Sequence, residues 1–346
     1  MKEATQYLQG KTVLISAGGT GGHVYPALTV AGANIKLHTI FVQGLRGNGI
    51  KRLLKAPLTL LSAAYQARRV LKTVSPDIFV GFGGFASGPG AMAAKLAGVP
   101  VVVHEQNAAM GLTNKIVSRW AKRVLLAFPI TGRPSKVGEV VGNPIRPSIA
   151  AIAAPAQRRQ PAPPFKVLVV GGSLGAKAIN DVVPQALTPL LDRITLTHQT
   201  GKTTFAETRA EYEKRGLLET VKVCEYIDDM DKAYAEADLL IARAGALTVS
   251  EIASVGVAAI FVPLPHAVDN HQFLNAKFLA DNDAAVIIEQ KELSAAHLRE
   301  VVTALLTPEK LRSMAENARQ QSHADALPAI IKTITGVLYD RDKNHH

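Results

Sequence analysis

The feature that most constrains the fold of this chain is an apolar run that ends in a glycine-rich turn, and it occurs twice. Residues 13–17 read Val-Leu-Ile-Ser-Ala and lead into Gly-Gly-Thr-Gly-Gly-His at residues 18–23. Residues 167–170 read Val-Leu-Val-Val and lead into Gly-Gly-Ser-Leu-Gly at residues 171–175. A strand that turns through glycines into a helix exposes backbone N–H groups, which bind anions. Two such turns predict two nucleotide-type domains.

Short apolar runs alternate with helical stretches along both halves of the chain. Runs that are apolar on both faces are typical of parallel sheets covered by helices, so we expect two doubly wound α/β domains. The first sheet is predicted from residues 13–17, 39–42, 77–81, 99–104, 123–127 and 139–141. The second sheet is predicted from residues 166–170, 194–198, 221–226, 239–242, 258–262 and 285–288.

Domain boundaries follow from a proline-rich segment that interrupts this alternation. We expect an N-terminal domain at residues 1–142, a linker at 143–165 and a C-terminal domain at 166–326. A last helix at residues 327–344 either caps the second domain or crosses back to the first.

One interval in the first domain, between Pro26 and Thr39, is too short for a strand–helix–strand unit. Barely two helical turns fit between Pro26 and Thr39, whereas a strand–helix–strand unit takes about 30 residues. Either the domain lacks a crossover, or residues are missing near Ala31 and Gly32. A true loss would remove part of the sheet next to the first glycine turn.

Composition restricts the class of protein and its partners. The 346 residues are 47% hydrophobic and 19% charged, as expected for a globular protein. A single cysteine, Cys224, excludes an internal disulfide, and no apolar run is long enough to span a membrane. A net charge of +11 predicts an anionic partner. Nucleic acid is disfavoured because aromatic residues make up only 5% and no reading motif is recognisable.

A helix predicted from Pro57 onward has two apolar faces. One face, with Leu60, Ala64, Ala67 and Leu71, is an ordinary core face, and the second face carries Leu58, Leu61 and Tyr65. Basic residues, Arg69 among them, flank the second face, and Ile50 lies just upstream. This pattern fits either reversible binding to an anionic lipid surface or a helix packed on both sides with solvated charges.

Further polar and glycine-rich segments follow predicted strands. A third glycine stretch lies at residues 81–90, and His-Glu-Gln-Asn at residues 104–107 follows an apolar strand. The carboxyl ends of parallel strands meet at one edge of a sheet, so these segments predict a ligand cleft. There the four polar side chains could hold sugar hydroxyls and phosphates.

The segment Gly-Ala-Leu-Thr-Val-Ser-Glu at residues 245–251 begins a helix. Thr248 and Glu251 have capping-box spacing, in which case the motif only caps that helix. Alternatively, free N–H groups hold a diphosphate while Glu251 accepts both hydroxyls of a ribose. Asp229 and Asp231 are spaced like metal ligands, but a helix start is favoured there, and no metal site is predicted.

Six of these segments together resemble the MurG family of bacterial glycosyltransferases, over nearly the whole chain. They are residues 18–23, 83–90, 104–107, 141–146, 171–175 and 245–251. The family transfers N-acetylglucosamine from UDP-N-acetylglucosamine to undecaprenyl-diphosphate-linked N-acetylmuramyl-pentapeptide, which converts lipid I to lipid II in peptidoglycan synthesis. Phe85 stands where the family usually has tyrosine, so no phenolic hydroxyl is expected there.

The resemblance implies a GT-B fold, in which two Rossmann-like domains face a central cleft. The C-terminal domain would bind the donor and the N-terminal domain the acceptor, without a cofactor. The protein would be peripheral on the cytoplasmic face of the bacterial inner membrane.

The resemblance also implies site residues. Ile227 would meet the uracil through its backbone, Glu251 the ribose and Gln272 the transferred sugar. The implied donor-site residues are Thr20, Gly21, Gly22, Asn107, Arg146, Ser173, Ile227, Ala246, Leu247, Thr248, Val249, Ser250, Glu251 and Gln272. The implied acceptor-site residues are Gly18, Gly19, Gly84 and His104, and the implied catalytic residues are His23 and Glu105.

The expected mechanism is an inverting single displacement. His23 is the first choice of base because an ordinary histidine pKa near 6.5 suits proton removal at neutral pH, and Glu105 is the second. Helix N-termini and Arg146 would stabilise the leaving diphosphate without metal.

Other function classes stay open. These are a UDP-sugar epimerase, a transferase with a soluble acceptor, and a non-catalytic protein that binds a lipid surface. A nicotinamide-dependent oxidoreductase is disfavoured because the first turn lacks a spaced Gly-x-Gly-x-x-Gly and the strand at 39–42 continues into Gln43, which is not acidic.

Overall fold

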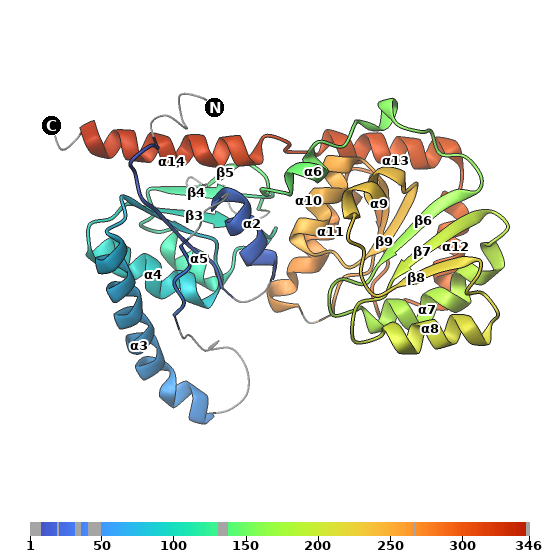
Figure 1. Ribbon diagram of the computed structural model, residues 1–346, viewed down its shortest axis with the longest axis horizontal. Helices are drawn as coiled ribbons and strands as arrows, with labels where there is room; N and C mark the ends of the chain where they lie inside the picture. The colour runs from blue at the N-terminus through green and yellow to red at the C-terminus, as the bar shows by residue number, and fades with distance from the viewer. Residues whose placement is uncertain are drawn as a thin grey trace. The chain divides into compact units, whose positions relative to one another are not determined.

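The computed structural model describes residues 8–18, 21–31, 36–40, 50–130, 138–265 and 267–343. The side chains of residues 21–23, 50–58, 60, 85–86 and 268 lie outside this description. The chain divides into two compact units, one of residues Met1–Ile145 with Ala324–His346 and one of residues Arg146–His323. Both units are α/β layers around a parallel sheet (Figure 1).

The first unit contains a five-stranded parallel sheet with strands in chain order. They are β1 (Val13–Ser16), β2 (Ile78–Gly81), β3 (Val101–Glu105), β4 (Arg123–Leu126) and β5 (Gly138–Val140). The helices of this unit are α2 (Gly21–Ala31), α3 (Ile50–Val74), α4 (Gly84–Leu96), α5 (Leu112–Val117) and α14 (Ala326–Lys343). In the described part of the chain, no helix is long and apolar enough to cross a bilayer.

Side chains alternate along these strands, so the sheet has an apolar core on each face. Ile78 and Val80 of β2, and Phe82 after it, pack with α2 and α14 on one face. Phe79 packs with α3 and α4 on the other face. Gly18 after β1 and the glycine turn after β2 therefore follow strands of a sheet that is packed on both faces.

Helix α14 belongs to the first unit although it follows the second in sequence (Figure 1). Ile330, Ile334 and Leu338 are buried in the core beneath the first sheet. The Arg341 guanidinium donates a 2.6 Å hydrogen bond to the carbonyl oxygen of Asp77. Of the two alternatives for the last helix, the structure therefore shows the one in which it crosses back.

The predicted strand at residues 39–42 is wrong for Thr39 and Ile40, which lie outside any strand; Phe41 and Val42 are outside the described residues. In the described sheet β1 is an edge strand, and its residues are only half-buried. A cavity of about 990 Å³ lies between β1, α2 and residues 36–40. A strand needs a hydrogen-bonded neighbour, and residues 36–40 have none across this cavity.

The start of α3 also differs from the prediction. The helix begins at Ile50 rather than Pro57, because the lysines, arginine and leucines upstream of the proline are good helix formers. Its predicted core face is confirmed at Ala67 and Leu71, which are buried. On the second face, Leu61 is 67% exposed and Tyr65 is 65% exposed.

The second unit contains a six-stranded parallel sheet in the order β11-β10-β9-β6-β7-β8. The strands are β6 (Phe165–Val170), β7 (Ile194–Gln199), β8 (Val221–Cys224), β9 (Leu239–Ala242), β10 (Ala258–Phe261) and β11 (Ala285–Ile287). The helices are α6 (Pro147–Ala150), η1 (Pro155–Gln157), α7 (Lys177–Leu187), η2 (Thr188–Leu190), α8 (Phe205–Lys214), α9 (Met230–Glu236), α10 (Ala246–Val255), η3 (Val268–Asn270), α11 (His271–Ala280), α12 (Ala295–Leu305) and α13 (Pro308–Gln320). Each of the six strands predicted for this half is confirmed.

The proline-rich segment is attached to the second unit from Arg146 onward. The Arg158 guanidinium donates hydrogen bonds to the carbonyl oxygens of Val255 at 2.8 Å and Ala235 at 3.2 Å. These carbonyls lie at the C-terminal ends of α10 and α9, where a cation is favourable. The segment therefore holds two helices that start at the carboxyl edge of the second sheet.

Candidate functional site

The second unit has a topological switch point between β6 and β9. The chain runs from β6 to β7 and β8 on one side, and then returns to β9 and continues to β10 and β11 on the other. Val170 of β6 lies opposite Ala242 of β9, so both central strands end at the same level. In open parallel sheets, ligands bind beyond the carboxyl ends of the strands at such a point.

Two helices begin at this switch point without a side-chain cap. The loop at residues 171–175 leads from β6 into α7, whose N-cap is Ala176, and β9 leads into α10, whose N-cap is Gly245. Ser294 and Thr307 cap α12 and α13 with their side chains, whereas α8, α9 and α11 also lack a side-chain cap, so α7 and α10 are distinguished by their position at the switch point. The uncapped N–H groups of α10 are suited to an anion.

The capping-box interpretation of residues 245–251 is therefore wrong. Helix α10 begins at Ala246, which places Thr248 inside its first turn rather than at the cap. Glu251 lies in the second turn and is 7% exposed. The spacing of Thr248 and Glu251 is correct for a cap, but the N-cap lies three residues earlier, at Gly245, whose backbone is extended.

Glu251 is held by two polar side chains from other elements. Its Oε1 accepts hydrogen bonds from Nε and Nη2 of Arg146 at 3.2 and 3.1 Å, and its Oε2 accepts one from the Tyr234 hydroxyl at 3.2 Å. Burial raises the pKa of Glu251, and Arg146 opposes this rise. The structure thus brings together Arg146 and Glu251, two of the predicted donor-site residues.

The other predicted donor residues of this unit lie on loops and helices at the same edge. Ser173 is exposed in the loop after β6, and Ile227 follows the end of β8. Gln272 lies in the first turn of α11, where its Oε1 accepts a 2.9 Å hydrogen bond from the backbone N–H of Leu264. Asp229 is the N-cap of α9, which confirms the helix start predicted there.

Two glycine turns meet in the first unit. Gly84 has a φ of +79°, and a Cβ on it would overlap the carbonyl oxygen of Gly18. The Ser87 hydroxyl lies 2.9 Å from the Ser16 carbonyl and 2.7 Å from the Gly83 carbonyl. Only glycine at position 84 permits this approach, so the predicted acceptor residues Gly18 and Gly84 are in contact.

Glu105 is buried at the end of β3, and both carboxylate oxygens are occupied. Oε1 accepts from the Asn107 backbone N–H at 3.0 Å, and Oε2 accepts from the Gly111 N–H at 3.0 Å and from Asn114 Nδ2 at 2.9 Å. The predicted donor residue Asn107 is half-buried beside it. Glu105 therefore braces the loop between β3 and α5 and offers no free carboxylate oxygen to a substrate.

His104 is fully buried with both ring nitrogens engaged. Nε2 lies 2.9 Å from the Gly142 carbonyl oxygen, and Nδ1 lies 3.2 Å from Nε2 of Gln106. These partners assign the proton to Nε2, and desolvation lowers the pKa of His104 to about 4. Contrary to the expectation of a direct acceptor contact, this ring joins β3 to the segment after β5.

Several predicted residues lie outside the described part of the chain. These are Gly19 and Thr20, together with the side chains of His23, Ile50 and Leu58. The backbones of Gly21, Gly22 and His23 form the first turn of α2, directly after the first glycine turn.

Some residues of the site carry no signal in the sequence. Tyr234 and Asn114 belong to no motif, and each contacts a predicted residue across a turn or a helix. Gln199, which also belongs to no motif, contacts the loop at residues 171–175. Asn143 lies in the motif at residues 141–146, but the motif does not predict the 3.1 Å hydrogen bond that its Nδ2 donates to the Gln106 carbonyl oxygen. Only the fold brings these pairs together.

Comparison with known proteins agrees with this arrangement. The glycosyltransferase family 28 C-terminal domain matches residues 166–330, and the glycosyltransferase family 28 N-terminal domain matches residues 29–126. The UDP-N-acetylglucosamine--N-acetylmuramyl-(pentapeptide) pyrophosphoryl-undecaprenol N-acetylglucosamine transferase of Aeromonas hydrophila is 48% identical, with 91% of this chain and 94% of the relative covered.

Two solved structures extend the comparison to the fold. The crystal structure of Acinetobacter baumannii MurG has a TM-score of 0.80 and 41% identity, and the match covers 94% of this chain and 99% of that one. The S. aureus MnaA-UDP co-structure has a TM-score of 0.64 at 14% identity over 97% of this chain and 92% of that one. The second likeness concerns the fold alone.

The alignment with the Aeromonas relative spans 342 positions, whereas 91% of this chain is about 315 residues, so about 27 positions of the alignment have no residue in this chain.

Proposed function

Because this chain belongs to the MurG family of glycosyltransferases, we propose that it transfers N-acetylglucosamine from UDP-N-acetylglucosamine to undecaprenyl-diphosphate-linked N-acetylmuramyl-pentapeptide in peptidoglycan synthesis. The donor binds mainly to the second unit and the acceptor to the first. The observation that carries this division is the pair of uncapped helix starts at the switch point of the second sheet.

In the donor site, each part of UDP-N-acetylglucosamine has a distinct set of contacts. The diphosphate lies at the N-terminus of α10 and the loop containing Ser173, because backbone N–H groups there favour negative charge. The ribose hydroxyls donate to Glu251, and the uracil contacts the backbone of Ile227. Gln272 binds the transferred sugar once its amide turns from the Leu264 backbone toward the ligand.

The reaction is a single displacement with inversion. A base on the first unit takes the proton of the acceptor's 4-hydroxyl as that oxygen attacks the anomeric carbon. The bond between this carbon and the diphosphate oxygen breaks, and UDP leaves with the electron pair. The α10 N-terminus and Arg146 stabilise the charge that develops on UDP.

His23 is the base in this proposal. It is the third residue of α2, and histidine is the side chain that most often acts as a general base. Glu105 and His104 are positioning residues, since their polar atoms already hold the loops around the acceptor site. This differs from the expectation that Glu105 serves as the alternative base.

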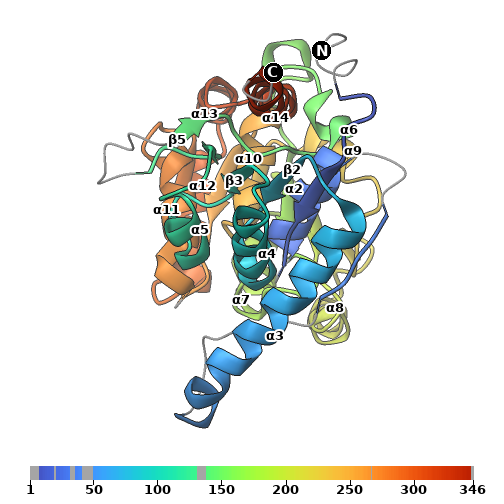
Figure 2. The same cartoon turned by 90° about the vertical axis from the view of Figure 1, so that its left-hand side faces the viewer.

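We assign the membrane contact to α3 and α4 of the first unit, which pack side by side (Figure 2). Exposed apolar side chains lie on both helices, namely Leu61 and Tyr65 on α3 and Met92 and Leu96 on α4. Arg69 is exposed on α3 near this surface. The combination supports reversible, peripheral binding to anionic lipid at the cytoplasmic face of the inner membrane.

Calorimetry with UDP-N-acetylglucosamine, UDP-N-acetylgalactosamine and NAD tests the donor assignment. The proposal predicts heat of binding with UDP-N-acetylglucosamine, weaker or no binding of the galactose epimer, and no heat with NAD. The absence of heat with either UDP-sugar would contradict it.

A further inference from the structure

Gln199 is not among the predicted donor-site residues. Its side-chain amide contacts both the glycine loop after β6 and the segment that follows β8. It is the last residue of β7 and is buried. Its Oε1 accepts from the Gly172 N–H at 3.1 Å, and its Nε2 donates to the Gly172 carbonyl oxygen at 3.0 Å. The same Nε2 donates to the Glu225 carbonyl oxygen at 2.8 Å. One amide therefore joins Gly172 to the segment two residues before Ile227.

Backbone contacts continue this attachment along the loop. The Gln199 carbonyl oxygen accepts from the Gly171 N–H at 2.8 Å, and the Ser173 carbonyl oxygen accepts from the Lys202 N–H at 3.1 Å. A Cβ on Gly201 would overlap the Gly175 backbone and lie 2.6 Å from the Gly172 carbonyl oxygen. Residues 199–202 therefore leave the loop at 171–175 little room to move.

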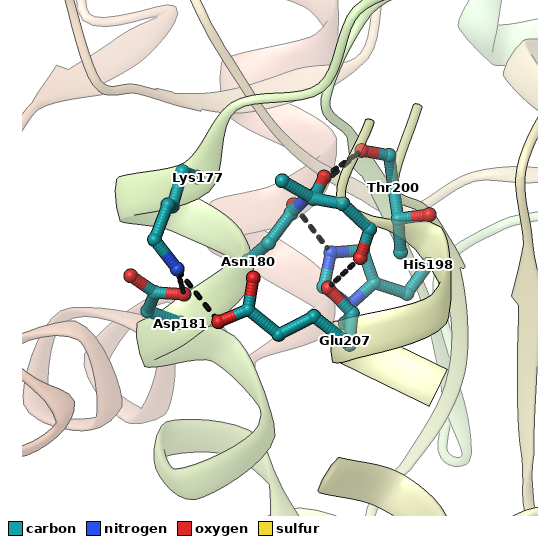
Figure 3. Close-up of polar contacts among 8 residues, drawn as sticks. Lys177, Asn180, Asp181, His198, Thr200 and Glu207 are labelled. Atoms are coloured by element: carbon teal, nitrogen blue, oxygen red, sulfur yellow. Dashed lines mark hydrogen bonds and ion pairs between the residues drawn. The ribbon is translucent and has the colours of Figure 1, made fainter. Parts of the chain in front are cut away.

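A buried polar network holds His198 and Thr200, the chain neighbours of Gln199; Figure 3 shows both residues together with Asn180. Asn180 of α7 donates to the Thr200 carbonyl oxygen at 2.8 Å, and its Oδ1 lies 3.0 Å from Nε2 of His198. Nδ1 of His198 lies 3.0 Å from the Tyr212 hydroxyl. Desolvation lowers the pKa of His198 to about 3, so the ring is neutral and its two partners fix the tautomer. The backbone on both sides of Gln199 is thus held in place.

We propose that Gln199 is a positioning residue that fixes the diphosphate-binding loop relative to the uracil-binding segment. The inference rests on the proposed donor site. UDP contacts both the loop at residues 171–175 and the uracil-binding segment near Ile227, so its affinity depends on the distance between them. Uridine contacts only the uracil-binding segment, so its affinity does not. The Glu225 carbonyl oxygen also accepts a hydrogen bond from the Gly201 N–H at 3.2 Å. The uracil-binding segment therefore keeps one hydrogen bond to residues 199–202 when the Gln199 amide is replaced.

Calorimetry with UDP and with uridine separates these roles. Gln199→Leu removes the amide at similar volume, and Thr195→Val, on an exposed position of the same strand, is the matched control. We expect Gln199→Leu to weaken UDP binding about 10- to 100-fold, because contacts to a charged group are lost. Uridine binding should change by no more than about threefold, and the control should match the wild type for both ligands.

Gln199→Glu provides a second variant. Its carboxylate still accepts from Gly172 N–H but faces two carbonyl oxygens, so UDP binding should be weak at pH 8. It should recover toward pH 5, where the protonated carboxyl can donate to one of them.

Equal losses of UDP and uridine affinity in Gln199→Leu, or UDP binding within threefold of the wild type, would overturn the inference. So would a Gln199→Glu variant whose UDP affinity relative to the wild type does not change with pH. Failure of the wild type to bind UDP would instead overturn the proposed function.

Discussion

Replacing Glu251 with glutamine tests the ribose contact with little change in shape. When Arg146 turns from Oε1 of Glu251 toward the diphosphate, the carboxylate can accept from two ribose hydroxyls, one on each oxygen. Hydrogen bonds to a charged group contribute about 1.5 to 2 kcal/mol each, whereas a neutral amide offers one bond of about 1 kcal/mol. The loss is therefore roughly 2 to 3 kcal/mol, or about 30- to 150-fold in UDP affinity.

The stability of the fold should change much less. The Arg146 side chain is 44% exposed, so it can be hydrated when the charge of Glu251 is removed. The glutamine also avoids the desolvation of a buried carboxylate, and we expect a change of less than about 1 kcal/mol in the free energy of unfolding. The matched control is Glu236→Gln. Glu236 lies on α9, and the substitution removes the charge that pairs with Lys166.

Binding of UDP and 2′-deoxy-UDP to both variants is the assay. The wild type and Glu236→Gln should prefer UDP by about tenfold, since one charge-assisted hydrogen bond is lost with the 2′-hydroxyl. Glu251→Gln should bind the two nucleotides within about threefold of each other. If Glu251→Gln keeps the wild-type preference for UDP, Glu251 does not contact the ribose and the reasoning is refuted.

The remaining predictions concern the charge of Glu251, the base, the glycine contact and the membrane surface. Because burial raises the pKa of Glu251 and Arg146 lowers it, UDP affinity should fall as the carboxylate protonates at low pH, and Arg146→Met should move the midpoint of this fall to higher pH. His23→Ala should lower turnover by about 10²-fold or more with UDP binding unchanged; a loss of only severalfold in steady-state assays would exclude His23 as the base. Gly84→Ala should reduce transfer by more than about tenfold, because the Cβ separates the two turns, while calorimetric UDP binding stays within twofold. Replacing Leu61 and Tyr65 with serine should weaken co-sedimentation with anionic vesicles by about tenfold, and unchanged sedimentation would remove α3 from the membrane contact.

The sheets could be predicted because each buried strand is a short run of apolar residues, which can be recognised without knowing its neighbours. Residues 99–104 are apolar on both faces, and the structure buries β3 between two helical layers. The strand predicted at 39–42 has a suitable pattern too. It fails at Thr39 and Ile40 because strand formation depends on a neighbour, and a cavity separates this segment from β1.

The site could be predicted less completely than the fold. Glycine turns and helix starts are local signals, so Gly84, Ser173 and Glu251 could be identified from motifs. The role of Glu105 could not, because its partners Gly111 and Asn114 are fixed only by the packing of α5 against β3. Gln199 carries no motif at all, and its contacts with Gly172 and Glu225 arise only from the fold.

Transfer of labelled N-acetylglucosamine from UDP-N-acetylglucosamine to a lipid-diphosphate-linked N-acetylmuramyl-pentapeptide tests the central claim most directly. The account predicts a disaccharide product with an inverted anomeric centre and stoichiometric release of UDP. Binding of the UDP-sugar without any labelled product, in the presence of acceptor and anionic vesicles, would contradict it.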